Sequence, residues 1–345
     1  MRVGIVGLAL SHPYIFAELA TREGHSVAAI WDSTPGKASE LVQRLSQSGA
    51  KDQRAGVTVP VAVDDPAEML PSGKVPVEAV FVCTPSGEHA RYALPFLKAG
   101  MPTFVDKALA TTPEDARQLL RAGREPGRLL MSTSVIRYAP AHQALIRQVK
   151  QGVLGPTPWA EGLVAHDIQG YLDGPSTWQD SVTQGGGSII NMGIHAVEPL
   201  VAAWGSDVES VYCEAAKTVY PASQSEDTAA MVVRYRDGRL ASIQVLCGSS
   251  QHGYELRVQG QKGTLQARAP SGLLQSLVGA GMGNGDPNEE YGYTATVRTF
   301  LQAVVSGQAP IPLAETATVI GILLAARKSA ATGRAVHLEE LALTD

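Results

Sequence analysis

The sequence has few charged residues and no long run of charges of one sign. Its 345 residues include 28 Lys and Arg and 33 Asp and Glu, so charged residues make up 18% of the chain and the formal net charge is −5. Soluble proteins typically contain about 25% charged residues. This shortage argues against a disordered chain and indicates a large buried interior. Because no basic stripe is present, we do not expect nucleic acid as a partner.

Cysteine is also scarce. Cys83, Cys213 and Cys247 are widely spaced and odd in number, so we expect neither a disulfide framework nor a zinc cluster. The eight histidines are scattered, and we expect no metal site. Unpaired cysteines fit a reducing compartment, which favours the cytoplasm. The apolar residues 1–10 are too short to span a membrane and lack a small-residue cleavage site, so we interpret them as a buried strand and expect no membrane association.

Short apolar runs alternate with helical patterns through the first 133 residues. Runs typical of strands buried on both faces lie at residues 2–6, 26–31, 58–63, 78–83, 102–105 and 128–133. Between them, helical spacing or helix-start signals occur at residues 11–22, 35–48, 88–98 and from 112 onward. This alternation predicts an α/β fold of the Rossmann type, with a doubly wound parallel sheet. We place this dinucleotide-binding domain at residues 1–133.

The pattern changes in residues 134–345, where strands follow one another directly. Residues 227–235 and 239–247 flank Arg236-Asp237-Gly238, and residues 254–259 and 263–269 flank Gly260-Gln261-Lys262. Both arrangements are typical of hairpins. Two helices, at about 294–306 and 314–332, are expected to close the chain. We therefore predict an α+β domain with a large open antiparallel sheet, for substrate binding and oligomerisation.

The turn after the first strand lies where a G-x-G-x-x-G dinucleotide fingerprint belongs. The aligned residues are Gly7, Ala9 and His12. Gly7 can make the tight turn. Ala9 replaces the glycine that lets the backbone approach the pyrophosphate, and His12 replaces the glycine that lets the helix pack closely on the strand. We assign Gly7, Ala9, Leu10 and Ser11 to cofactor binding, because this turn joins a strand to a helix that Ser11 can cap.

Asp32 follows the second strand. Its carboxylate is placed to accept hydrogen bonds from a ribose diol, and it would repel a 2′-phosphate. We therefore expect NAD rather than NADP as the cofactor. The alternative is a doubly wound domain that keeps the turn but has weakened or lost the nucleotide.

Three later motifs carry a family resemblance. Residues 82–89 read VCTPSGEH, residues 100–110 read GMPTFVDKALA, and residues 185–196 read GGGSIINMGIHA. Together they resemble the glucose–fructose oxidoreductase / inositol dehydrogenase (Gfo/Idh/MocA) family, whose second motif reads A-G-K-x-V-x-x-E-K-P-L-A and third G-G-G-x-L-x-D-x-G-x-H. The resemblance covers nearly the whole chain. It implies an NAD(P)-dependent oxidoreductase that transfers hydride from a hydroxyl of a sugar, polyol or related small molecule.

The resemblance implies three catalytic residues. Lys107 matches a lysine that contacts both the nicotinamide ribose and the substrate hydroxyl. His195 matches the acid/base histidine that binds substrate, and an imidazole titrates in the right range for that role. Asn191 matches an aspartate; its amide can bind a hydroxyl but cannot act as a base. The spacing of four places Asn191 and His195 on one face of a helix.

The same resemblance implies further cofactor contacts. Thr84, Pro85 and His89 match the loop that lines the nicotinamide, and Asp106 stands where the family has glutamate, directly before Lys107. Ala108 replaces a proline whose peptide bond is often cis in the family, a form that alanine resists.

Four residues are assigned to the substrate by resemblance. Arg137 and Tyr138 match an Arg-aromatic pair at the start of the second domain. Arg137 would bind a carboxylate or a sugar hydroxyl, or else form an ion pair between domains. His166 and Trp178 lie where relatives carry variable substrate residues. Trp178 would stack on a sugar face or simply pack in the core.

Three functions therefore stay open. The first is the dehydrogenase that the resemblance implies. The second is a non-redox small-molecule-binding or regulatory protein with weakened cofactor binding, motivated by the altered residues Ala9, His12, Asp106, Ala108 and Asn191. The third is a lyase or hydrolase that uses the nicotinamide for a transient oxidation. By resemblance we also expect a homo-oligomer, either a dimer or a tetramer.

Overall fold

The computed structural model describes residues 1–49, 59–173, 177–270 and 286–343. The chain divides into two compact units. The first unit comprises Met1–Ala110, Gln118–Ser132 and Thr296–Leu313, and the second comprises Thr111–Arg117, Thr133–Ala295 and Ala314–Asp345. The boundary that we place between residues 133 and 134 stays a prediction. The return of Thr296–Leu313 to the first unit is a feature that strand–helix alternation does not reveal.

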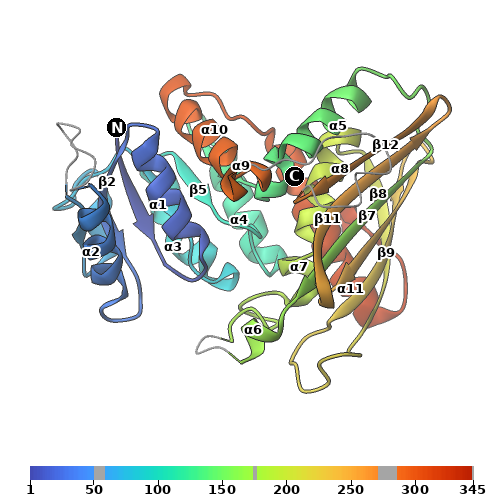
Figure 1. Ribbon diagram of the computed structural model, residues 1–345, viewed down its shortest axis with the longest axis horizontal. Helices are drawn as coiled ribbons and strands as arrows, with labels where there is room; N and C mark the ends of the chain where they lie inside the picture. The colour runs from blue at the N-terminus through green and yellow to red at the C-terminus, as the bar shows by residue number, and fades with distance from the viewer. Residues whose placement is uncertain (50–58, 174–176, 271–285, 344–345) are drawn as a thin grey trace. The chain divides into compact units, whose positions relative to one another are not determined.

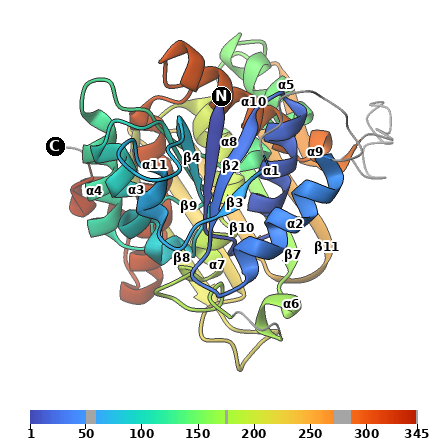
Figure 2. The same ribbon diagram turned by 90° about the vertical axis from the view of Figure 1, so that its left-hand side faces the viewer.

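The first unit is built on a six-stranded parallel sheet with the order β3-β2-β1-β4-β5-β6. Its strands are β1 (Arg2–Val6), β2 (Ser26–Trp31), β3 (Val61–Ala62), β4 (Ala79–Val82), β5 (Thr103–Val105) and β6 (Leu130–Ser132). Helices α1 (His12–Arg22) and α2 (Lys37–Gly49) lie on one side of the sheet, and α3 (His89–Lys98) and α4 (Pro113–Arg124) on the other (Figure 2). The strand order reverses between β1 and β4, which is where ligands bind in such sheets. The predicted Rossmann-type fold is confirmed.

A cluster of four phenylalanines fills the core of the first unit. Phe16 lies on α1, Phe81 on β4 and Phe104 on β5, and Phe300 comes from α10 (Tyr293–Ser306). The Phe300 ring centroid lies 4.9 Å from that of Phe81 and 5.6 Å from that of Phe104. These contacts hold α10 on the same face of the sheet as α1.

The second unit contains a seven-stranded sheet with the order β12-β11-β7-β10-β9-β8-β13. Its strands are β7 (Trp159–Asp167), β8 (Val208–Ala216), β9 (Thr228–Tyr235), β10 (Leu240–Leu246), β11 (Gly248–Gly260), β12 (Gly263–Ala269) and β13 (Val336–His337). The two predicted hairpins are present as the antiparallel pairs β9/β10 and β11/β12. One pair, β7 and β10, is parallel, so the sheet is mixed but largely antiparallel.

Helices cover one face of this second sheet. Helix α8 (Ile194–Trp204) contacts β7 and β11, and α5 (Pro140–Lys150) contacts β12 and α8 (Figure 1). In the part of the unit that the structure describes, further α-helices are α6 (Gln169–Leu172), α7 (Gly187–Asn191), α9 (Pro287–Glu290) and α11 (Leu313–Thr332). Side chains of β9 alternate between buried and exposed, which leaves the opposite face of the sheet open. The exposed side chains of Tyr212, Val232 and Leu246 lie on this open face.

Candidate active site

The turn after β1 is tied to both neighbouring strands. The Gly7 N–H donates to the Trp31 carbonyl at the end of β2 (2.7 Å), and the Ala9 N–H donates to the Cys83 carbonyl after β4 (3.1 Å). Gly7 has φ of +90°, and a Cβ atom there would lie 2.5 Å from a Thr84 methyl carbon. Only glycine fits this position. The tight turn expected at Gly7 is therefore present, although Ala9 and His12 depart from the fingerprint.

Asp32 stands at the end of β2 and closes the turn from the other side. Its Oδ2 accepts the Leu8 N–H at 2.6 Å, and its Oδ1 accepts the Thr34 N–H at 2.8 Å. Each oxygen uses one backbone donor, and a carboxylate can accept about four hydrogen bonds in all. The carboxylate is thus oriented by the backbone and retains capacity for a ribose diol. Lys37 also binds this turn, through its ammonium and the Leu8 carbonyl.

The remaining turn residues lie at the carboxyl edge of the sheet. Ala9 and Leu10 are half-buried and Ser11 is exposed. Ser11 occupies the N-cap position of α1, but its hydroxyl makes no capping hydrogen bond, so the expected side-chain cap is absent. Across the turn, the hydroxyl oxygen of Thr84 is buried and has no hydrogen-bond partner in the described part of the chain. A glycine cradle, an oriented carboxylate and a buried unpaired hydroxyl together fit a bound dinucleotide.

His89 connects the loop after β4 to the segment that carries Lys107. The His89 ring is fully buried, with Nδ1 2.9 Å from the Ala108 carbonyl oxygen and Nε2 2.9 Å from the Thr84 carbonyl oxygen. Burial lowers the pKa of His89, although the charge of Asp106 and the backbone carbonyls oppose this shift. The structure thus places His89 between two backbone segments. We infer that it shapes the loop of Thr84 and Pro85.

Asp106 directly follows β5, and Lys107 comes next in the chain. The side chains of both residues are buried. The Lys107 carbonyl accepts a hydrogen bond from the Ser86 hydroxyl at 3.4 Å. The Lys107–Ala108 peptide bond is cis, contrary to the expectation that alanine would keep it trans. Asp106 contacts His12, the residue that replaces the third fingerprint glycine, through the imidazole Nδ1.

Asn191 and His195 lie in the second unit, both buried. Asn191 is the last residue of α7, whereas His195 belongs to α8, which begins at Ile194. The prediction that one helix carries both residues is therefore wrong. Gly193 lies in the break between the helices, where a Cβ atom would lie 2.2 Å from the Ile189 carbonyl oxygen. A tight connection replaces the continuous helix at this glycine.

His195 is held by a residue that motif reasoning did not single out. Its Nδ1 lies 2.7 Å from Oγ of Ser134, which also accepts the Ile136 N–H at 3.2 Å. Ser134 caps the short helix η3 (Val135–Tyr138), which fixes the position of its hydroxyl. The Tyr254 ring packs on the imidazole at a centroid distance of 4.8 Å. These contacts define the orientation of the His195 ring.

Arg137 forms a buried ion-pair network within the second unit. Its guanidinium donates to Glu198 at 3.1 Å and to Glu315 at 2.7 Å, and Glu198 also accepts the Thr133 hydroxyl at 2.9 Å. Burial raises the pKa of Glu198, although the Arg137 charge opposes that shift. Both partners lie in the same unit as Arg137, so the expected ion pair between domains is not what these contacts form, and substrate binding by Arg137 stays a prediction. The partner Glu198, one helical turn after His195, carried no motif signal.

The other substrate candidates differ in burial. Tyr138 and His166 are half-buried, and Trp178 is buried. The His166 ring lies 4.3 Å from that of His252 and 5.8 Å from that of Tyr171. A cavity beside Asn191 measures about 10 Å³, about enough for one water molecule. That cavity is too small for a sugar.

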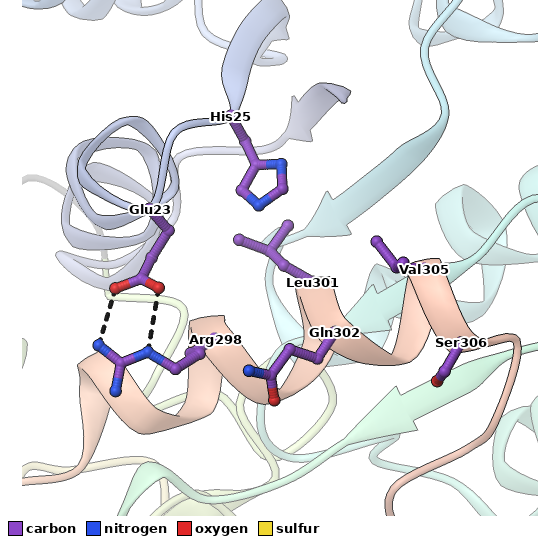
Figure 3. Close-up of a pocket in the computed structure, with 7 residues that line it drawn as sticks. All are labelled: Glu23, His25, Arg298, Leu301, Gln302, Val305 and Ser306. Carbon is purple, nitrogen blue, oxygen red and sulfur yellow. Dashed lines mark hydrogen bonds and ion pairs between the residues drawn. The ribbon is translucent and has the colours of Figure 1, made fainter.

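A larger pocket, of about 290 Å³, lies in the first unit between the end of α1 and helix α10 (Figure 3). Arg298 forms a bidentate ion pair with Glu23 there, at 2.8 and 3.0 Å. His25, which also lines the pocket, immediately precedes β2. The pocket therefore lies at the amino ends of the strands. Ligands of parallel sheets bind at the carboxyl ends, so we do not include it in the candidate site.

Among residues 1–49, 59–173, 177–270 and 286–343, no three His, Cys, Asp or Glu side chains are grouped so that they could hold a metal ion. In the same ranges, no helix has both the length and the apolar character needed to cross a membrane.

Comparison with known proteins gives matches along the chain. Residues 1–134 match the model of the oxidoreductase family with an NAD-binding Rossmann fold, and residues 142–266 match the GFO/IDH/MocA C-terminal domain. D-glucoside 3-dehydrogenase of Escherichia coli (strain K12) is 31% identical over 201 residues, which cover 57% of this chain but only about half, 52%, of that relative. Myo-inositol 2-dehydrogenase of Thermotoga maritima is 24% identical, and the alignment covers 99% of both chains.

Solved structures show the same architecture. The WlbA dehydrogenase from Bordetella pertussis, crystallised with NADH and UDP-GlcNAcA, matches with a TM-score of 0.79 and 22% identity, over 97% of this chain and 98% of that one. At this identity the likeness concerns the fold. Because one family's N-terminal and C-terminal models match consecutive parts of the chain, this protein belongs to the GFO/IDH/MocA family of oxidoreductases, whose N-terminal domain is an NAD-binding Rossmann fold.

Proposed function

We propose that this protein is an NAD-dependent dehydrogenase that oxidises a CH–OH group of a sugar, a polyol or a related small molecule. The observation that carries the proposal is the buried His195, whose Nδ1 lies 2.7 Å from the Ser134 hydroxyl. An oriented imidazole supplies the acid/base group that a hydroxyl oxidation requires. Two relatives, a glucoside dehydrogenase and an inositol dehydrogenase, support the substrate class.

The oxidation of an alcohol removes a hydride from carbon and a proton from oxygen. NAD, when bound, supplies a nicotinamide ring that accepts the hydride. In the proposed reaction His195 takes the proton at Nε2, while its Nδ1–H donates to Oγ of Ser134. Lys107 stabilises the negative charge that grows on the substrate oxygen. Asn191 orients the hydroxyl by hydrogen bonding, because an amide cannot remove its proton.

The other predicted residues receive roles in the same scheme. We propose that the turn at Gly7, Ala9, Leu10 and Ser11 surrounds the pyrophosphate and that Asp32 binds the ribose. The residues proposed to act by shaping the site are His89 and Asp106. Thr84 and Pro85 stay proposed nicotinamide contacts, and Tyr138, His166 and Trp178 stay proposed substrate contacts.

The test combines purified protein with NAD or NADP and a panel of sugars and polyols, and follows the absorbance of reduced nicotinamide. We expect turnover with NAD, its loss in Lys107→Met and His195→Asn, and normal activity in Lys98→Met, which changes an exposed lysine of the same unit. No calorimetric NAD binding at millimolar concentration would refute the proposal and favour the non-redox alternative. A tightly bound cofactor that recycles itself would favour the lyase or hydrolase.

We also propose a homo-oligomer that pairs the open sheet faces of two second units. Tyr212 on β8 lies opposite Val232 on β9, and both are exposed. An apolar strip on an open sheet supports a contact between copies. Val232→Lys should then lower the molar mass measured by light scattering, whereas Val305→Lys, on exposed α10 surface, should not. A cytoplasmic location stays a prediction, supported by the three buried cysteines, none of which forms a disulfide.

A further inference from the structure

Two residues that depart from the family motifs contact each other. His12 is the first residue of α1 and stands where the fingerprint has its third glycine; Asp106 follows β5 and stands where the second motif has glutamate. The His12 Nδ1 lies 2.9 Å from Oδ2 of Asp106 and 3.0 Å from Oδ1. Their exposed fractions are only 7% and 2%. A buried carboxylate needs such a partner, because burial disfavours an unpaired charge.

The same carboxylate also binds the backbone of Lys107. Oδ1 of Asp106 accepts the Lys107 N–H at 2.8 Å. Burial opposes ionisation of Asp106, but the charges and hydrogen bonds of His12 and Lys107 outweigh it and lower the pKa of the carboxyl. The carboxylate is thus held by an imidazole from the nucleotide-binding turn on one side and by the lysine segment on the other.

Two further titratable groups face Asp106. Burial and the Asp106 charge raise the pKa of the Cys83 thiol, and burial lowers the pKa of His89. Both shifts favour the neutral forms of these groups. Neither group therefore supplies a charge that could replace His12 as the partner of the carboxylate.

We propose that His12 and Asp106 act as a positioning pair, in which His12 fixes the Asp106 carboxylate and the carboxylate fixes the Lys107 backbone. The inference rests on the proposed role of Lys107. It explains why the two departures occur together in one chain. A glutamate at position 106 is longer by one methylene and would push its carboxylate into the imidazole. A glycine at position 12 would remove the imidazole and leave the buried carboxylate with only its Lys107 contacts.

The first test is a double-mutant cycle on the ligand-free protein, with His12→Gly, Asp106→Glu and the double variant. Each single variant should lower the melting temperature, by roughly 5–15 °C. The double variant, which carries the family residues at both positions, should recover at least half of the summed loss. As a matched control, His25→Gly changes a histidine of the same unit that lines the distant pocket, and its effect should add to that of Asp106→Glu. Additive losses for His12→Gly and Asp106→Glu would overturn the pair.

The second test separates positioning from mere stability. His12→Gln keeps a side-chain donor beside the carboxylate, so it should keep more activity than His12→Ala. In His12→Ala, kcat should fall at least tenfold, while the calorimetric Kd for NAD changes less than threefold. An unchanged kcat in His12→Ala would overturn the positioning role. If the unaltered protein shows no turnover, the proposed function fails, whereas the cycle in the ligand-free protein still decides whether the pair exists.

Discussion

Replacing Asp32 with asparagine should weaken NAD binding and reduce the preference for NAD over NADP. The Asp32 carboxylate accepts one backbone N–H on each oxygen, at 2.6 and 2.8 Å from Leu8 and Thr34. An asparagine has the same shape but only one accepting oxygen. Its amide nitrogen must face either one of these N–H groups or the ribose. The variant therefore loses both the negative charge and part of the capacity to accept hydrogen bonds.

The size of the effect follows from the bonds that are lost. A hydrogen bond to a charged group contributes about 1.5–3 kcal/mol net, and every 1.4 kcal/mol changes a Kd about tenfold. Loss of one ribose hydrogen bond should raise the Kd for NAD by roughly 10- to 150-fold. The Kd for NADP should not rise in parallel, because the variant also loses the repulsion between the carboxylate and the 2′-phosphate.

The assay is calorimetric titration of NAD and NADP into the unaltered protein, Asp32→Asn and Asp207→Asn. Asp207 is an exposed aspartate of the second unit, and its substitution changes the net charge by the same amount. We expect the ratio of the two Kd values to change only in Asp32→Asn. A ratio that stays constant in this variant, with its melting temperature unchanged, would refute the assignment of Asp32 to the ribose.

Four other changes test the remaining parts of the structure. Lys107→Met should lower kcat by roughly 10²- to 10³-fold in the absorbance assay, and a smaller loss than tenfold would contradict its catalytic role. Ser134→Ala removes one hydrogen bond from His195 and should lower kcat about tenfold; unchanged kinetics would exclude Ser134 as a positioning residue. Phe300→Ala removes a ring that is 0% exposed and should cost about 3–5 kcal/mol in urea unfolding. Val305→Ala on the same helix changes a side chain that is 78% exposed and should cost less than about 0.5 kcal/mol, so equal losses would contradict the packing of α10. His142 is buried, and burial lowers its pKa to about 4. As the pH falls below about 6.5, the unfolded chain binds a proton at this histidine and the folded chain does not. The free energy of unfolding should therefore fall by about 3 kcal/mol as the pH is lowered from about 6.5 to 4. His142→Leu should flatten that part of the stability profile, and an equally steep profile would refute the assignment.

Strand–helix alternation in the first unit was predictable because its signals are local. An apolar run that is covered on both faces identifies β1 or β4 without knowledge of the neighbours. The return of α10 was not predictable in this way. Phe300 meets Phe81 and Phe104, which lie far earlier in the chain, and an amphipathic helix does not encode which sheet it covers.

In the candidate site, too, local signals predict some positions, whereas contacts between residues distant in sequence are not predictable. Gly7 and Asp32 lie at strand ends, where the order of elements alone brings them together. Asn191 and His195 were placed on one helix by their spacing, but spacing does not reveal that the chain turns tightly at Gly193. Ser134 contacts His195 across 61 positions of sequence, and no motif links the two residues.

The contact between His12 and Asp106 changes how the departures from the family motifs at these two positions are interpreted. Counted one by one, a lost glycine and a shortened acid each suggest a decayed cofactor site, which favoured a non-redox function. In the structure the shorter acid, Asp106, lies against the larger residue, His12. The His12 imidazole is a hydrogen-bonding partner of the Asp106 carboxylate. A site that had decayed would have no physical reason to keep a buried carboxylate, because its desolvation is costly unless it is paired. The two substitutions therefore favour a rebuilt site over a lost one, and the double-mutant cycle measures the coupling between His12 and Asp106 on which this argument depends.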